Sequence, residues 1–199
     1  MLQIISRPPT PDRPACAGSG RPLRALALVG LALLLCCPRA FAAQAGWSNA
    51  YPTRYATIYY AGDKDLSQFT RNIGSGMSFL GESQDKNPML AKNRVDRIVD
   101  VVMRLLDMNP PNFHFTVYVY QKRADVESAY RRLGMMGPVP PAFYAHQTES
   151  ITVSVEEITD GMLAHEIAHA VICHHFPSPP PMKMQEILAQ YVDKHLGEE

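Results

Sequence analysis

The amino-acid sequence predicts one α+β domain over residues 43–199, preceded by an export leader over residues 1–42. Two kinds of pattern indicate this fold class. Three short segments have the β-branched and aromatic content of strands, and other segments repeat apolar residues at helical spacing. A chain of 199 residues is also of the right length for one domain with a buried core.

The first 42 residues have the three parts of a secretory signal. Arg21 and Arg24 precede an uncharged apolar run over residues 25–37, and Ala40–Ala43 supplies an A-x-A cleavage site. Residues 1–20 are rich in Pro and Arg, which is typical of a disordered leader. The apolar run is short for a bilayer span, so we expect no stable span after cleavage. We therefore expect a secreted or periplasmic protein, with a retained N-terminal anchor as the alternative.

Removal of the leader changes the charge and the cysteine content. Residues 1–42 contain five Arg and one Asp, which leaves 14 of the 19 basic and 18 of the 19 acidic residues, a net charge of −4. A mildly acidic domain lacks the basic surface that nucleic-acid binding requires, so nucleic acid is not an expected partner. Cys173 is the one cysteine beyond the leader, and we expect it to be a buried thiol without a disulfide.

The first part of the domain is predicted to alternate strands and helices. The clearest helix is the one in which Val95, Ile98 and Val102 recur at helical spacing. The segments expected in order are an irregular lead-in over residues 43–52, a strand over 55–60, a short helix over 63–70, a loop over 74–88, a helix over 91–107 and a strand over 113–120.

The second part of the domain is predicted to end in two helices joined by prolines. Gly134 is suited to end the first helix here, and Thr159 or Asp160 can cap the next. The segments expected are a helix over 125–133, a loop over 134–141, a strand over 151–155, a helix from about 160 to 175, an extended connection over 177–181 and a helix over 183–196.

The helix expected over 160–175 carries the pattern H-E-x-x-H at residues 165–169. Residues four apart on a helix lie about 40° apart around its axis and about one turn apart along it, so His165 and His169 can reach one ion. Glu166 lies one step round the helix, where it can hold a water bound to the metal. Zinc lowers the pKa of such a water to about 7, which makes Glu166 a candidate general base. The alternative is an ordinary amphipathic helix with two histidines on its polar side.

A catalytic zinc ion needs a third protein ligand and one open position. Glu186 is the better candidate, because we expect it to be a buried carboxylate among apolar neighbours on the next helix, which is costly unless it is paired or bound to a metal. The alternative for Glu186 is a surface residue of an amphipathic helix. His175 has the spacing of the third metzincin histidine, but Ile172 replaces the glycine at which that helix turns back.

These residues resemble the gluzincin zinc metallopeptidases, and most closely the peptidase MA-like family. The resemblance covers residues 151–196: a strand, the H-E-x-x-H helix, and a second motif, Q-E-I-L-A-Q-Y, that is similar to E-G-L-A-E-Y. It implies a zincin-like fold, with a small mixed sheet, an active-site helix and a second C-terminal ligand helix. It further implies that His165, His169 and Glu186 bind Zn²⁺, that Glu166 is the base, and that a peptide or protein substrate lies along strand 151–155 at the sheet edge.

The sequence also departs from that family. Ile187 replaces the usual glycine, and Gln190 stands where some relatives have an acid that orients a ligand. The 13 residues after Glu186 contain no counterpart of the family's transition-state donor. We expect Tyr144 or His146 to supply that donor, with Tyr191 as a further option. The alternative is that Phe143 and Tyr144 only pack against their neighbours.

The sequence therefore predicts a zinc-dependent hydrolase that cleaves peptide bonds. Two other functions stay open at this point. One is a zinc-binding assembly or interaction module that has lost catalysis, against which the intact Glu166 argues. The other is a zinc hydrolase that acts on a different amide, such as the peptide linkages of a cell wall.

Overall fold

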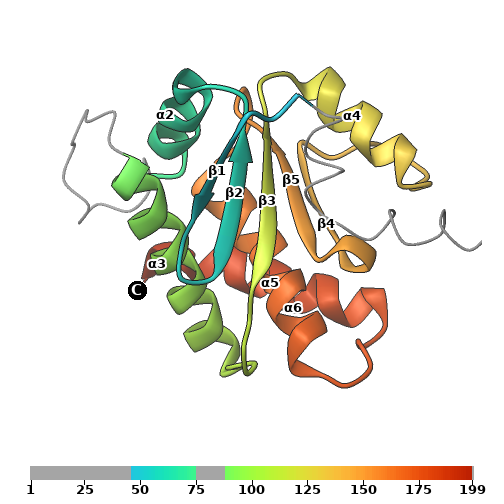
Figure 1. Cartoon of the computed structure of the whole chain (residues 1–199). Helices are drawn as coiled ribbons and strands as arrows, with labels where there is room; N and C mark the ends of the chain where they lie inside the picture. Colours follow the sequence, from blue (N-terminus) through green and yellow to red (C-terminus); the bar gives the residue numbers. More distant parts are fainter. Residues whose placement is uncertain (1–45, 75–87, 199) are drawn as a thin grey trace, which may run out of the picture. The chain divides into compact units, whose positions relative to one another are not determined.

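The structure is a computed structural model that describes residues 46–74 and 88–198 (Figure 1). The expected leader over residues 1–42 and most of the expected loop over 74–88 lie outside the described residues. Within the described part, a five-stranded mixed sheet combines with five α-helices, so the predicted α+β class is confirmed.

The sheet has a parallel centre and two antiparallel edges. Its strands are β1 (Asn49–Pro52), β2 (Ala56–Tyr60), β3 (Phe115–Tyr120), β4 (Ala142–Ala145) and β5 (Ser150–Ser154). Their order across the sheet is β1-β2-β3-β5-β4. β2, β3 and β5 pair in parallel, whereas β1 pairs antiparallel with β2 and β4 pairs antiparallel with β5.

The helices follow the predicted order. They are α2 (Asp63–Asn72), α3 (Pro88–Leu106), α4 (Arg123–Arg132), α5 (Asp160–His175) and α6 (Met182–His195), with short 3₁₀ turns η1 (His146–Thr148) and η2 (Leu196–Glu198). Gly134 follows α4 at a φ of +73°, as expected of a residue that ends a helix in the left-handed region. Across the described residues, no helix combines the length and the apolar content that a bilayer span requires.

Two strands were not predicted, and both lie at the sheet edges. The lead-in expected to be irregular contains β1, and residues expected only to precede a strand form β4. Both strands have four residues, too few to establish a period-2 pattern, and each follows or contains prolines. Pairing with a longer neighbour, rather than local sequence, therefore determines them.

The expectation that residues 151–155 form the sheet edge is wrong. β5 lies between β3 and β4, and all five of its residues are buried. A strand covered on both sides and both faces is not available to a ligand. β4 forms the edge instead, and it lies beside α5, which carries the H-E-x-x-H pattern.

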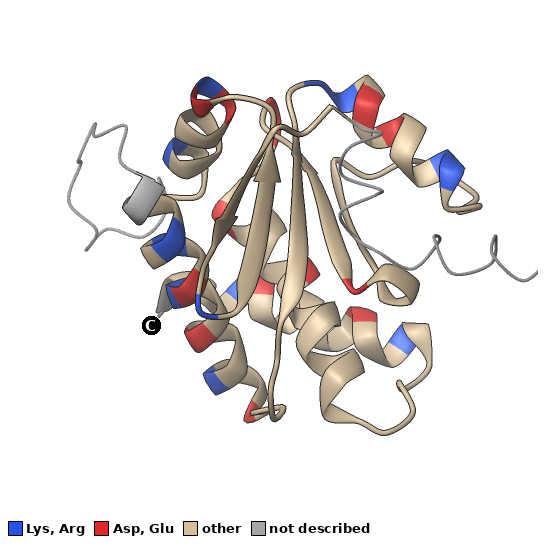
Figure 2. Cartoon of the chain, in the orientation of Figure 1, with Lys and Arg blue, Asp and Glu red and all other residues tan. Residues whose placement is uncertain are grey.

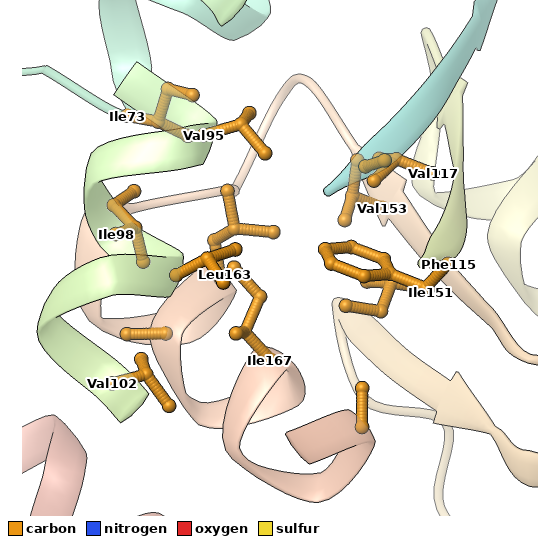
Figure 3. Packing of buried hydrophobic residues seen from close by; sticks show 14 of the residues in the cluster. Ile73, Val95, Ile98, Val102, Phe115, Val117, Ile151, Val153, Leu163 and Ile167 are labelled. Carbon is orange, nitrogen blue, oxygen red and sulfur yellow. The ribbon is translucent and has the colours of Figure 1, made fainter. Parts of the chain in front are cut away.

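The main hydrophobic core lies between the sheet and helices α3 and α5 (Figure 3). Leu163 and Ile167 of α5 lie between Ile98 and Val102 of α3 on one side and Phe115 and its neighbours on the strands on the other. Because α5 is covered on most sides, ten of its residues are buried. Burial on this scale fixes the rotation of α5, and hence the direction in which its polar side chains point.

The other face of the sheet is covered by α4 and an aromatic cluster. Trp47 stacks on Tyr118 with a centroid separation of 4.3 Å, and its indole N–H donates to Val119 O at 3.1 Å. Tyr130 of α4 meets Phe143 of β4 edge to face. Trp47 therefore covers β3, and Tyr130 packs α4 on β4.

The charged residues lie on helices and turns, whereas the five strands contain none (Figure 2). Charged groups avoid the buried strands because their desolvation is costly there. An ionisable group next to the sheet therefore needs a specific partner, and Glu166 is such a group.

Candidate metal centre

Helix α5 begins with a side-chain cap and presents one polar stripe. Thr159 Oγ1 accepts from Met162 N at 3.3 Å, as the sequence predicted for one of two possible caps. His165 and His169 are separated by one turn, and their ring centroids lie 5.1 Å apart. Because the apolar positions of α5 occupy the core, the two imidazoles are turned towards α6.

Helix α6 packs antiparallel against α5. The N-terminal end of α5, at Gly161, lies against the Asp193 carboxylate, and its C-terminal end, at Cys173, contacts Gln185. The proline-containing connection makes this reversal possible, since Phe176 and Pro181 both have extended backbone. The reversal brings Glu186 beside the two histidines.

The Glu186 carboxylate faces both imidazoles. Its Oε2 atom lies 3.6 Å from His165 Nε2 and 3.7 Å from His169 Nε2. One ligand atom of each residue lies within 4.8 Å of the others. Ligands of a tetrahedral zinc ion lie about 3.3 Å apart at bond lengths of about 2.0–2.1 Å, so the two carboxylate–imidazole distances are close to those of ligands that share one ion. The group is therefore compatible with a bound metal ion, and nitrogen and oxygen donors of this kind suit zinc.

The two sides of this group differ in exposure. The His169 side chain is 11% exposed, whereas that of Glu186 is 44% exposed. Burial lowers the pKa of His169, and the neighbouring His165 lowers it further. A neutral imidazole is the form that binds a metal, so burial favours the ligand form of His169. The expectation of a buried Glu186 carboxylate is therefore wrong, because its neighbours Met184 and Ile187 on α6 are themselves exposed and solvent reaches this side of the group.

Two glutamines hold the groups in place. Gln190 Nε2 donates to Glu186 Oε1 at 2.8 Å, which leaves Oε2 directed at the imidazoles. Gln185 is buried, and its Oε1 lies 3.3 Å from His169 Nδ1. Each glutamine contacts the atom of a candidate ligand that points away from the site. Contacts of this type orient metal ligands.

Glu166 lies between α5 and the edge strand β4. Its Oε2 accepts from Tyr144 N at 2.7 Å. The register explains why this N–H is available. Ser154 N donates to Pro141 O, so these two residues form a hydrogen-bonded pair of the antiparallel ladder. Hydrogen-bonded and non-hydrogen-bonded pairs alternate, so Tyr144 and Ile151, three positions along, form a non-hydrogen-bonded pair. Tyr144 N therefore points away from β5, to the free side of β4.

Burial raises the pKa of the Glu166 carboxyl to about 8. The Tyr144 N–H opposes this rise by stabilising the carboxylate, and the negative charge of Glu186 adds to it. A carboxyl with its pKa near neutrality is suited to exchange a proton during a reaction. A cation bound by the neighbouring histidines would stabilise the carboxylate and lower this pKa.

The two candidate donors lie beside one another at the end of β4. The Tyr144 hydroxyl is 3.4 Å from His146 Nδ1, and His146 is exposed. Burial raises the pKa of Tyr144 above its ordinary value, with smaller contributions from Cys173 and Glu149. The phenol therefore stays protonated, and able to donate, at neutral pH. Their role as transition-state donors stays a prediction.

The other histidines of α5 lie away from the group. His174 Nδ1 donates to Ala170 O at 2.8 Å, and its Nε2 lies 3.5 Å from Glu149 Oε1 in the β4–β5 turn. His175 is exposed and meets Phe176 edge to face. Among the described residues, the group that could hold a metal ion consists of His165, His169 and Glu186, without His175.

Sequence reasoning missed Gln185 as part of this group. It directly precedes Glu186, in a helix turn whose other members, Met182 and Met184, are exposed. Its position beside a candidate ligand was the one signal in the sequence. Whether such a glutamine contacts the site depends on its burial, and the sequence does not show the burial of a single polar residue.

No protein-family model, no curated protein and no solved structure matches this chain. The interpretation of the site therefore rests on the residues and their geometry.

Proposed function

We propose that the chain is a zinc-dependent peptidase with a zincin-like fold, similar to the gluzincins. The observation that carries the proposal is the convergence of His165, His169 and Glu186 on one point, with Glu166 held next to them. The H-E-x-x-H spacing supports the same function independently of that geometry. We further propose that the leader exports the protein, which would then act in the periplasm or outside the cell.

In amide hydrolysis, different residues would bind the metal and transfer the proton. A zinc ion bound by His165, His169 and Glu186 would supply a Lewis acid that polarises the scissile carbonyl and acidifies a water molecule. Glu166 would take a proton from the attacking water as the C–O bond forms. Glu166 would then return that proton to the leaving nitrogen as the C–N bond breaks, so that the carboxylate is regenerated.

The edge strand β4 supports a peptide as the substrate. The backbone carbonyl of Tyr144 lies on the free side of the strand, where an extended peptide could pair with it, whereas Ala142 is 2% exposed. The Tyr144 N–H is occupied by Glu166, so a substrate would use the remaining groups of the strand. Tyr144 or His146 would donate a hydrogen bond to the oxyanion.

The test compares the zinc-loaded protein with Glu166→Gln on casein and on a peptide library, with and without a chelator. We expect cleavage by the wild type, loss of cleavage on chelation, and loss of cleavage in Glu166→Gln by at least about 100-fold. The zinc content of the variant should equal that of the wild type, because Glu166 is not a ligand. Exposed Glu127, on α4, supplies the matched control Glu127→Gln, which should cleave normally.

Two results would overturn the proposal. Full cleavage by Glu166→Gln would remove Glu166 from the reaction. A wild-type protein that binds zinc but cleaves neither casein nor any library peptide would favour the zinc-binding assembly module instead.

A further inference from the structure

The most constrained polar side chain near the candidate metal centre is Gln185. It is 6% exposed, and both ends of its amide have partners. The Nε2 atom donates to Pro180 O at 2.8 Å, within the connection between α5 and α6. The Oε1 atom lies 3.3 Å from His169 Nδ1 and 3.5 Å from Cys173 Sγ.

These contacts fix the orientation of the amide. A backbone carbonyl can only accept, so the NH₂ group of Gln185 must be the end that faces Pro180. Its Oε1 must then face His169 and Cys173. The thiol donates to the same oxygen, and a carbonyl oxygen has two lone pairs, so both acceptor positions are used.

The orientation of the amide in turn fixes the proton on His169. A ring nitrogen that faces a carbonyl oxygen makes a hydrogen bond only when it carries the hydrogen, so Nδ1 of His169 must be protonated. In the neutral imidazole, Nε2 is then without a proton. Nε2 is the atom that faces the Glu186 carboxylate at 3.7 Å.

We propose that Gln185 is a positioning residue that holds His169 in the tautomer whose Nε2 can bind a metal. This inference rests on the proposed metal site and adds a requirement to it. Since the amide is anchored on Pro180, it also links the proline-containing connection to the site. The connection would therefore do more than reverse the chain, because its carbonyl selects the ligand form of a histidine one helix away.

The first test uses Gln185→Met, which keeps the length of the side chain and removes both polar ends. Nitrogen NMR of the His169 ring, in protein freed of metal by a chelator, reads the tautomer directly. We expect the wild type to carry the proton on Nδ1 and the variant to populate the form with the proton on Nε2. Zinc affinity, measured by competition with a chromophoric chelator, should fall by about 10–100-fold.

Two further variants keep the test decisive. Gln190→Met removes the glutamine that contacts Glu186, and it should leave the His169 tautomer unchanged. Gln185→Glu covers the case in which Gln185→Met does not fold. Its carboxylate still accepts from Nδ1 but cannot donate to Pro180, so we expect the wild-type tautomer to persist.

The proposal is overturned if Gln185→Met keeps the proton on Nδ1 and binds zinc within about twofold of the wild type. It is equally overturned if Gln185→Glu shifts the proton to Nε2. The tautomer is measured without metal or substrate. A protein in which the tautomer responds as expected but no peptide is cleaved would therefore refute the proposed activity and leave the role of Gln185 standing.

Discussion

The middle and the last turn of α5 both carry a pair of histidines, and the two pairs have different surroundings. His165 and His169 share one face and meet a carboxylate from α6. Around the helix axis, His174 lies about 140° from His169 in one direction and His175 about 120° from it in the other. His174 meets a carboxylate from the β4–β5 turn, and His175 is exposed.

The two histidine pairs also differ in how many imidazoles one glutamate contacts. Glu149 has 61% of its side chain exposed and contacts one imidazole, that of His174, which is 19% exposed. Glu186 contacts two imidazoles at nearly equal distances, which makes a group of three side chains that could hold a metal ion. The comparison teaches that histidines on one helix become a candidate metal centre only through the element packed against them.

Removal of a histidine from the middle of α5 should have the largest effect on metal binding. His165→Ala deletes one of the three proposed ligands, so we expect zinc affinity to fall by more than about 100-fold, beyond the loss typical of a residue that contacts a ligand without binding the metal. Competition with a chromophoric chelator measures the change. His175→Ala is the matched control on the same helix and should bind zinc as the wild type does. Equal losses in the two variants would erase the distinction between the pairs.

The pKa of Glu166 predicts how the stability of the metal-free protein depends on pH. The folded pKa of about 8 exceeds the ordinary value of 4.5, so unfolding releases a proton between these values. The free energy of unfolding should therefore fall as pH rises from about 4.5 to about 8, by an amount on the order of a few kcal/mol.

Urea unfolding in the presence of a chelator, at about pH 5 and about pH 9, measures this change. Glu166→Gln cannot ionise and should lose that part of the pH dependence. Glu127→Gln, at an exposed position, should retain it. A wild-type protein whose stability has the same pH profile as Glu166→Gln would contradict the enclosed position of Glu166.

Loss of the contact to Glu186 should have a smaller effect on metal binding. Gln190→Ala removes the donor to Glu186 Oε1 but leaves all three ligands, so we expect zinc affinity to fall by about 10-fold. The same competition assay applies. A loss as large as that of His165→Ala would mean that Gln190 acts directly at the site.

The smallest effect on zinc affinity is expected from substitutions in the last turn of α5. His174→Ala removes a partly buried imidazole that contacts Glu149 and packs edge-on against Phe113, so stability should fall by about 1–2 kcal/mol. Zinc affinity should stay within about twofold of the wild type. A large loss of zinc in His174→Ala would show that both halves of α5 take part in binding.

Strong local patterns made much of the fold predictable. The apolar spacing of Val95, Ile98 and Val102 predicted α3. The cap at Thr159 and the apolar positions that follow it predicted α5. β4 was not predictable, because four residues after Pro140 and Pro141 form a strand only by pairing with β5.

In the candidate site, as in the fold, the local pattern was predictable and the contacts made by tertiary packing were not. The spacing of His165 and His169 placed two ligand atoms on one face of a helix, which is a local property. Glu186 required the assumption that α6 folds back on α5, and the structure brings its carboxylate to both imidazoles. The contact of Glu166 with Tyr144 and the burial of Gln185 depend on tertiary packing, so no local pattern could indicate them.

The most direct test of the central claim is X-ray absorption spectroscopy of the zinc-loaded protein, together with its zinc content. We predict one zinc ion per chain, bound by two imidazoles and a carboxylate at about 2.0–2.1 Å, and loss of that signal in a His165→Ala, His169→Ala double variant. A wild-type protein that retains no zinc, or a double variant with an unchanged spectrum, would contradict it.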